Sequence, residues 1–227
     1  LTAAHVLYDE ENQTWADAVD FYPRFHKKRA DEQGESRAEG YVVWEEFERH
    51  LNEDNYHDMT QLDIAILYNE DLNSASYPAL NILYEDQFLN LYSDREKLVT
   101  GYPQWTSWLD YSYVKEENEL TMHRFGPENF WIRTPLIYWP EQVLGRRYWN
   151  FVNDVIPGLP RNSGGPLYLK DDDGRWMCSG ILTRGDDRES IYRALGEDVI
   201  ELLRLAKDAV EDNSMMPVLD LNAAQDG

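Results

Sequence analysis

The chain has 227 residues, 42% of them hydrophobic, and its 43 acidic and 21 basic residues give a net charge of −22. This length suffices for one large domain or two small ones, and the hydrophobic content argues against a disordered chain. No apolar run approaches the length of a membrane span. Such an acidic surface repels nucleic acid and anionic membranes, so neither is expected as a partner.

The first part of the chain predicts two strands separated by polar segments. Residues 6–40 are polar and charged, and they read largely as loops. β-Branched and aromatic residues predict a strand at 41–44. A continuous apolar run predicts a second, buried strand at 62–67, with Asp63 at its mouth. Polar residues and Pro78 then interrupt the pattern over 69–95, as expected of a connecting segment.

Apolar runs predict further strands in the second part, at 97–100, 109–114, 120–124, 131–138, 167–169 and 176–182. The polar segment 115–118 and the Asp-Gly pair at 173–174 each separate two of these runs and predict hairpins. The carboxylates of 171–173 could attract calcium, but no bidentate glutamate follows at the spacing of a calcium loop, so a solvated turn is expected.

One helix is predicted, from Gly196 to Glu211. Its apolar residues recur at three- and four-residue spacing, which places them on one face: Val199, Leu202, Leu203, Ala206, Ala209 and Val210. Residues 213–227 are expected to form a loose tail.

Cysteine chemistry is limited to one residue, Cys178, so an internal disulfide is excluded. Its apolar surroundings favour a small buried side chain over a nucleophile. No spacing typical of zinc or haem ligands is present. The sequence therefore predicts no metal site.

A candidate nucleophile lies in the stretch 159–167, where Ser163 stands between Asn162 and two glycines. Glycines allow a sharp turn that can present a serine hydroxyl to a substrate. Such a hydroxyl needs a general base, and the base needs a carboxylate that fixes its tautomer. His5, after Ala3-Ala4, and Asp63 supply those groups, and the three residues follow one another in the order His, Asp, Ser.

These three motifs resemble those of chymotrypsin-like serine proteases. The segment 99–103 and Asn162 are closer to the bacterial glutamyl-endopeptidase branch than to trypsin. The resemblance runs from residue 1 to about residue 211. It implies a serine endopeptidase with the triad His5, Asp63 and Ser163, no cofactor, and a protein or peptide as substrate. It also implies a secreted or extracytoplasmic protein, although no signal peptide is visible in the chain.

The resemblance further implies a mainly β fold of two antiparallel β-barrels with a C-terminal helix. Residues 1–95 would form the first barrel and the connection, residues 96–211 the second barrel and the helix, and residues 212–227 a tail. Strands that precede the His motif in the family have no counterpart here. The first barrel is therefore expected to be incomplete in this chain, and the natural protein to be longer.

Alternative interpretations stay open at this point. Each residue of the triad also suits a structural role, as a core histidine, a strand-end carboxylate or a turn serine. Four other histidines compete for the role of base, although none follows an Ala-Ala pair: His26, His50, His57 and His123. A catalytically inactive homologue that binds peptides or proteins is the alternative function.

Two departures from the family concern the segment before the nucleophile. The oxyanion hole would use the backbone N–H groups of Arg161 and Ser163, but the family usually has glycine where this chain has Arg161. Asn162 replaces the Asp that pairs with a new N-terminal amine in trypsin-type members. That activation switch is therefore not expected.

The expected substrate pocket is walled by Pro157, Leu182, Thr183, Arg184 and Gly185. Pro157 stands where trypsin-like members carry the Asp that binds Lys or Arg, so cleavage after basic residues is not expected. Leu182 replaces the His of glutamyl-endopeptidases. Thr183 and Arg184 could hold an acidic side chain, whereas an apolar pocket would result if Arg184 points to solvent.

Overall fold

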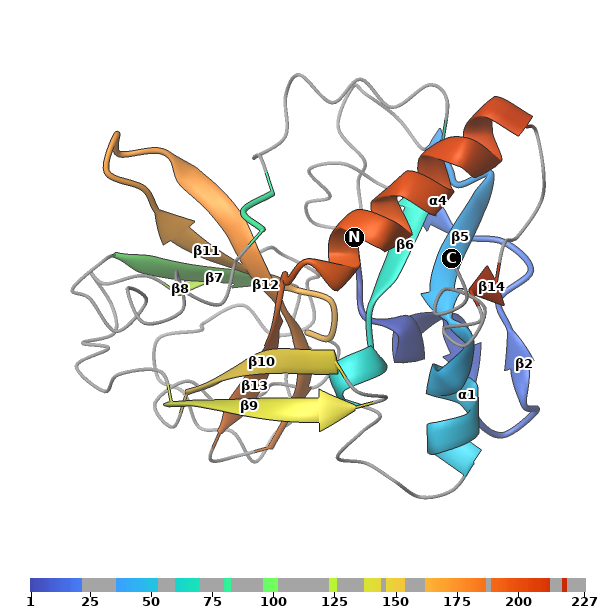
Figure 1. The fold of residues 1–227 in the computed structure, drawn as a ribbon, viewed down its shortest axis with the longest axis horizontal. Helices are drawn as coiled ribbons and strands as arrows, with labels where there is room; N and C mark the ends of the chain where they lie inside the picture. Colours follow the sequence, from blue (N-terminus) through green and yellow to red (C-terminus); the bar gives the residue numbers. More distant parts are fainter. Residues whose placement is uncertain are drawn as a thin grey trace.

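The computed structural model describes residues 1–21, 36–52, 60–69, 80–82, 96–101, 123–125, 137–143, 146–153, 162–186, 189–212 and 218–219. Within these ranges the protein is mainly β, with two lobes and a long helix, α4 (Asp198–Asp212), that lies over the first lobe (Figure 1). None of the described helices is long and apolar enough to cross a membrane.

The first lobe is formed by the described residues between 1 and 68 together with the last described strand. Its elements are η1 (Ala4–Leu7), β1 (Tyr8–Asp9), β2 (Thr14–Trp15), β3 (Asp20–Phe21), β4 (Ser36–Arg37), β5 (Gly40–Trp44), α1 (Glu45–Asn52), β6 (Ala65–Tyr68) and β14 (Val218–Leu219). β5 pairs antiparallel with β6 and parallel with β14. β1–β2 and β3–β4 form two short antiparallel pairs.

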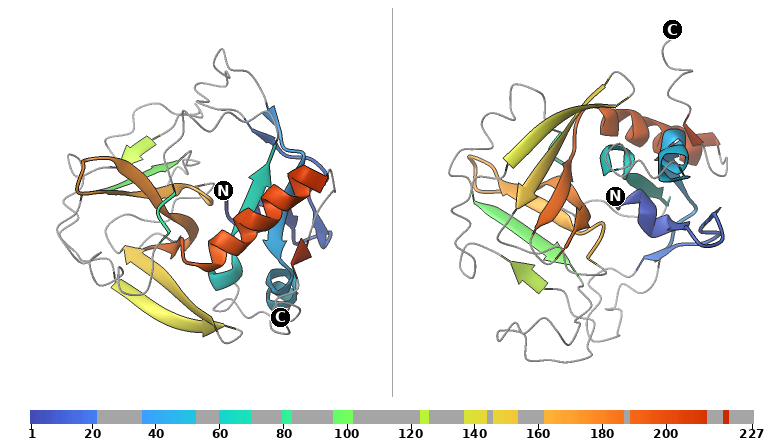
Figure 2. Two further views of the ribbon diagram at one scale, coloured as in Figure 1. Left: turned by 45° about the horizontal axis from the view of Figure 1, so that its top comes forward. Right: turned by 90° about the horizontal axis from the view of Figure 1, so that it is seen from below.

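The second lobe is a seven-stranded antiparallel sheet with the order β8-β7-β11-β12-β13-β10-β9. Its strands are β7 (Lys97–Gly101), β8 (His123–Phe125), β9 (Ile137–Val143), β10 (Arg146–Asn153), β11 (Pro166–Lys170), β12 (Trp176–Gly185) and β13 (Ser190–Ala194). Figure 2 shows the start of the chain near the middle of the molecule, between the two lobes.

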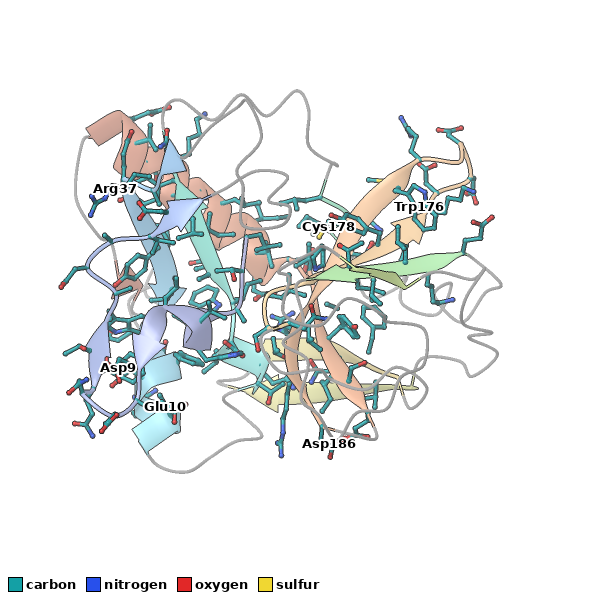
Figure 3. The ribbon with its side chains drawn as sticks, turned by 180° about the vertical axis from the view of Figure 1, so that it is seen from behind. Asp9, Glu10, Arg37, Trp176, Cys178 and Asp186 are labelled. Carbon is teal, nitrogen blue, oxygen red and sulfur yellow. The ribbon has the colours of Figure 1, made fainter. Side chains whose placement is uncertain are left out.

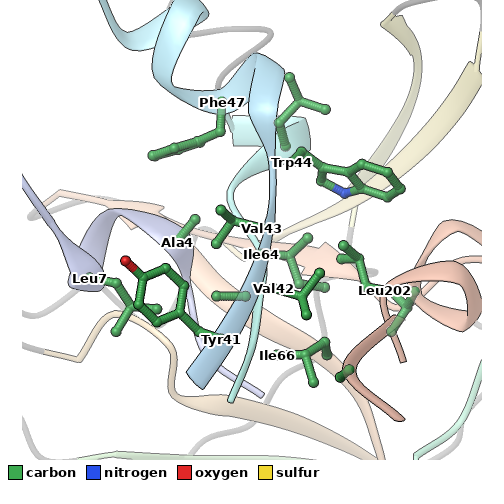
Figure 4. Close-up of a cluster of buried hydrophobic side chains, with 14 of the residues drawn as sticks. Ala4, Leu7, Tyr41, Val42, Val43, Trp44, Phe47, Ile64, Ile66 and Leu202 are labelled. Atoms are coloured by element: carbon green, nitrogen blue, oxygen red, sulfur yellow. The ribbon is translucent and has the colours of Figure 1, made fainter. Parts of the chain in front are cut away.

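One apolar core joins the lobes. Trp44 of β5, Phe47 of α1 and Leu202 of α4 are fully buried in it (Figure 4). Ile181 and Cys178 of β12 belong to the same cluster. The helix contributes because its apolar residues face β5 and β6 on one side. Consequently the second lobe cannot move away from the first without exposing apolar surface.

Several predicted elements are confirmed. The strands at 41–44 and 97–100 form as β5 and β7 with one more residue each, and the Asp-Gly hairpin forms as β11–β12. In its turn, Arg175 pairs with Asp171 and Asp173. The predicted helix begins two residues later than expected and ends at Asp212.

Other expectations need correction. Residues 60–62 form a helical turn, so the buried strand begins at Ala65 and not at residue 62. The helix α1 was not predicted, because its charged residues hide an apolar face of Phe47 and Leu51. Two closed barrels are not observed among the described strands, and the β14–β5 pair is parallel.

Some predictions fall largely outside the described residues. Of the hairpin predicted at 109–124, only residues 123 and 124 are described, within β8, and of the strand at 131–138 only its last two residues, within β9. β10 and β13 were not predicted. Val218 and Leu219 of the expected tail form β14.

Candidate active site

Asp63 binds His5 through both of its carboxylate oxygens. The backbone N–H of His5 donates to Oδ1 at 2.8 Å, and Nδ1 of the imidazole lies 2.6 Å from Oδ2. The Asp63 side chain is 1% exposed, whereas 27% of the His5 side chain reaches solvent. A buried, immobile carboxylate therefore orients a ring whose other edge is partly accessible.

His5 and Asp63 come from opposite ends of the sequence that forms the first lobe, and backbone hydrogen bonds bring them together. Thr2 and Ala65 exchange two backbone hydrogen bonds, of 2.9 and 2.8 Å, as an isolated antiparallel bridge. Ala3 and Ala4 are completely buried, so the short helix η1 that carries His5 is fixed against the core. The small side chains allow this close approach of η1 to the start of β6.

The pKa of His5 is set by opposing effects. Burial lowers it, but the hydrogen bond and charge of Asp63, together with the charge of Glu10, raise it by more, so the pKa lies above its ordinary value of 6.5. Figure 3 shows Asp9 and Glu10 on the surface of the first lobe, just after η1. Because an ionised carboxylate only accepts hydrogen bonds, Nδ1 carries the hydrogen and Nε2 is left as a proton acceptor.

Ser163 lies in a tight turn on the second lobe. The N–H of Gly165 donates to the carbonyl of Asn162 at 2.9 Å, which closes the turn. Gly164 has φ +78°, a conformation that glycine adopts without strain. Two further backbone bonds with Leu182, of 2.7 and 2.8 Å, fasten the turn to β12. The Ser163 side chain remains half-buried.

The turn also touches the segment that carries His5. A Cβ added to Gly164 would lie 2.3 Å from Thr2 Oγ1 and 3.2 Å from the Ala3 nitrogen. The two lobes therefore meet at the candidate nucleophile. Within the described residues, no hydrogen bond joins the Ser163 hydroxyl to the His5 ring. Catalytic hydrogen bonds are often long in unliganded sites and shorten when substrate binds.

The pocket residues are described only in part. Arg161 and Pro157 lie outside the described residues. Leu182 is buried, Arg184 and Gly185 are exposed, and a β-bulge interrupts the register with β13 between Leu182 and Arg184. At this bulge the hydroxyl of Thr183 donates to the carbonyl of Ile191 at 3.3 Å.

The remaining candidate residues have clearer positions. Cys178 is buried, and burial raises the pKa of its thiol to about 11, which suits a core residue and not a nucleophile. His50 and His123 lie on α1 and β8, while His26 and His57 lie outside the described residues. No group of acidic, His or Cys side chains that could hold a metal ion occurs in the described part of the chain.

Sequence reasoning missed one buried polar cluster next to the site. Arg193 of β13 is completely buried, and it contacts the carbonyl of Gln61, two residues before Asp63, as well as the carboxylate of Asp198. The only signal in the sequence is an arginine within a short run of otherwise apolar and small residues, 190–195.

Comparison with known proteins finds similarity in structure and not in sequence. No protein-family model and no curated protein matches the sequence. The structure of a Glu endopeptidase superposes with a TM-score of 0.57 over 91% of this chain and 80% of its own length, at 13% identity. The protease Anisep from Arthrobacter nicotinovorans superposes with a TM-score of 0.54 over 90% of this chain and 81% of its own, at 12% identity. The resemblance to chymotrypsin-like serine proteases is thus confirmed for the fold.

Proposed function

We propose that this chain is a serine endopeptidase that hydrolyses peptide bonds through an acyl-enzyme. The observation that carries the proposal is the double contact of Asp63 with His5, beside the turn that bears Ser163. Ser163 is the nucleophile, His5 its general base, and Asp63 the group that orients His5 and stabilises its charged form. The shared fold with two proteases supports this assignment.

In the proposed reaction, Ser163 Oγ attacks the carbonyl carbon of the substrate while its proton passes to His5 Nε2. The C–N bond then breaks, the same proton moves to the departing amine, and an ester to Ser163 remains. Water, activated by His5, hydrolyses that ester. The backbone N–H groups of Arg161 and Ser163 would stabilise the negative oxygen. The two lobes would correspond to the two barrels of the resembled family, with the substrate between them, in a protein that acts outside the cytoplasm.

The proposed specificity excludes Lys and Arg before the scissile bond, because Pro157 offers no carboxylate at the base of the pocket. Thr183 already donates its hydroxyl hydrogen to a backbone carbonyl, which reduces its value as a donor to an acidic substrate. Arg184 remains the cation on this strand that would select acidic residues. A pocket without its participation would select apolar ones. Profiling with a peptide library decides between these two, and a profile dominated by Lys or Arg contradicts the proposal.

The decisive experiment is labelling with a fluorophosphonate probe. We expect one probe molecule per chain, attached to the peptide that contains Ser163 in mass spectrometry, together with hydrolysis of an unfolded protein substrate. Ser163→Ala should lose both activities while it keeps the wild-type circular dichroism and melting temperature. Asn213→Ala, which changes no residue of the site, is the matched control and should be labelled like the wild type.

Two observations favour the alternative of an inactive homologue that binds peptides. Arg161 replaces the usual glycine of the oxyanion hole, and within the described residues His5 and Ser163 do not share a hydrogen bond. A folded wild-type protein that resists the probe and cleaves nothing, yet retains peptides from the library, would establish this alternative.

A further inference from the structure

A fully buried cation lies where the second lobe meets the segment that carries Asp63. The guanidinium of Arg193 donates from Nε to the carbonyl of Gln61 at 2.7 Å and pairs through Nη2 with Asp198 Oδ2 at 2.5 Å. Its Nη1 donates to the carbonyl of Ala194. Arg193 is 0% exposed and the Asp198 side chain only 8%. One side chain thus joins β13, the start of α4 and the first lobe.

Stability alone is a weak reason for such an arrangement. Desolvation of two charges offsets much of their attraction, and apolar replacements of buried ion pairs are often as stable or more stable. A guanidinium does, however, fix the orientation of the groups that it binds, because its N–H donors lie in one plane at fixed angles, like a fork. Here all three nitrogens of the guanidinium donate, Nη2 to the carboxylate of Asp198 and the other two to backbone carbonyls.

The segment from Gln61 to Ala65 has little freedom. Its first carbonyl is held by Arg193, and its last residue is held by the two backbone bonds between Ala65 and Thr2. Between them Leu62 is completely buried, and the N–H of Ile64 donates to the carbonyl of Leu62 at 2.8 Å. Asp63 therefore projects from a short span that is fixed at both ends.

We propose that Arg193, anchored by Asp198, is a positioning residue that holds Asp63 in place for His5. Its effect on turnover rests on the proposed function, whereas its effect on the contact between Asp63 and His5 does not. Loss of the hydrogen bond between Arg193 and the Gln61 carbonyl should let the Asp63 carboxylate move relative to the His5 ring. Misplacement of a supporting group by about 1 Å can reduce turnover on the order of 10²-fold.

The test compares Arg193→Met with Leu202→Ala. Methionine keeps the unbranched apolar stem of the side chain at residue 193, but it has no N–H group that could donate to the carbonyl of Gln61. Leu202→Ala loosens the same helix from the core but keeps the donor and the acceptor of the Arg193–Gln61 hydrogen bond, and so serves as the matched control for lost stability. The readouts are the NMR titration of the His5 ring, identified by its absence in His5→Gln, and the kcat and KM of peptide hydrolysis.

We expect Arg193→Met to lower the pKa of His5 from its wild-type value and to reduce kcat by about 10- to 100-fold, with KM changed by less than about 2-fold. Leu202→Ala should melt at a lower temperature but keep the His5 titration and kcat. A folded Arg193→Met protein with the wild-type His5 titration overturns the proposal. So does an equal change in both variants, because that result would indicate general loosening.

Arg193→Lys and Asp198→Asn make the test independent of whether the methionine variant folds. Lysine keeps the charge but not the fork, and so should restore stability better than it restores the His5 titration. Asp198→Asn should shift the His5 titration in the same direction as Arg193→Met, and an unchanged titration contradicts the proposal. A wild type that neither labels nor cleaves would refute the peptidase proposal alone, since the His5 titration still measures the positioning.

Discussion

At the scale of single residues, Asp63 is the most constrained group of the candidate site. Both of its oxygens are engaged by His5, one with the backbone N–H and one with Nδ1. The backbone bond fixes the carboxylate, so that the second oxygen can act only on the ring. A substitution of Asp63 that keeps its size therefore tests how the orientation of the His5 ring affects catalysis, while the fold of the segment is retained.

The first prediction is that Asp63→Asn lowers kcat by about 10⁴-fold with little change in KM, as in proteases with this arrangement. An amide can still accept from the His5 N–H, but its NH₂ group placed against Nδ1 favours the tautomer with hydrogen on Nε2, which cannot accept the proton of Ser163. Steady-state kinetics on a peptide ester measures this. Asp208→Asn, on the exposed face of α4, is the control and should keep full activity.

The second prediction concerns pH. Burial lowers the pKa of His5, but Asp63 and Glu10 raise it by more. Since the base must be neutral, kcat/KM should fall as the pH drops through this raised pKa, with its midpoint above 6.5. Glu10→Gln removes one negative charge near the ring and should move the midpoint to lower pH, less so in high salt.

Glu11→Gln is the control for that pH profile, because Glu11 belongs to the same exposed loop but does not contribute to the raised pKa of His5. A midpoint that moves to higher pH in Glu10→Gln would show that another group, and not His5, controls the acid side of the profile.

At the scale of elements, the turn 162–165 has to satisfy both lobes at once. The third prediction is that Gly164→Ala is destabilised and loses activity on the order of 10²-fold or more. A non-glycine residue at φ +78° costs about 1–2 kcal/mol, and the added Cβ would lie 2.3 Å from Thr2 Oγ1. Even if the Thr2 side chain rotates away, the added Cβ would lie 3.2 Å from the backbone nitrogen of Ala3, so we expect the turn to shift away from the segment that carries His5.

Gly174→Ala is a closely matched control. Gly174 has φ +82°, in the hairpin turn between β11 and β12, but a Cβ there would have no atom within 4 Å. The two variants should therefore lose similar stability from the backbone, in urea unfolding, while only Gly164→Ala loses turnover. Equal activity of the two would mean that the contact with Thr2 does not position Ser163.

The sequence predicts elements well where local chemistry decides them. β5 follows from its run of valine and aromatic residues, and β11–β12 from the Asp-Gly turn between apolar runs. The helix α1 was not predicted, because three of its first four residues are glutamate. Its burial depends on the contact of Phe47 with a core that is formed by strands distant in the sequence. The strand β13 was not predicted, because an arginine within a short segment suggests an exposed position.

The candidate site divides in the same way. The contact between His5 and Asp63 was predictable from the residue types, because a general base needs a carboxylate that fixes its tautomer, whereas the role of Ser163 stays a prediction. The contact of Arg193 with Gln61 was not predictable, since 132 positions separate the two residues and only the packing of the lobes brings them together. Closure of the sheets into barrels is not observed among the described strands, and pairing partners at sheet edges leave no local signal in the sequence.

At the scale of the whole molecule, the excess of negative charge is the dominant electrostatic feature. Ion pairs on the surface, such as Arg204–Asp208 and Lys207–Glu211 on α4, can neutralise only part of the negative charge, because 43 acidic residues face 21 basic ones. Exposed pairs of this kind contribute about 0–1 kcal/mol each. The remaining carboxylates repel one another, and this repulsion opposes the compact state more than the unfolded one.

The fourth prediction is therefore that potassium chloride stabilises the protein. Between 0.05 and 1 M salt the screening length falls from more than about 10 Å to about 3 Å. The long-range repulsion among the carboxylates, which results from the net charge of −22, is then lost. The attraction within close ion pairs is weakened less. We expect a gain on the order of 1 kcal/mol, which raises the melting temperature by about 2–4 °C in a chain of this size. The same series at pH 5.5, nearer to the isoelectric point of 4.4, is the control, and there the gain should shrink because protonation of histidines and of some carboxylates lowers the net negative charge. A gain of equal size at both pH values would point to salting-out of apolar surface, and a loss at neutral pH would mean that attractive pairs outweigh the repulsion.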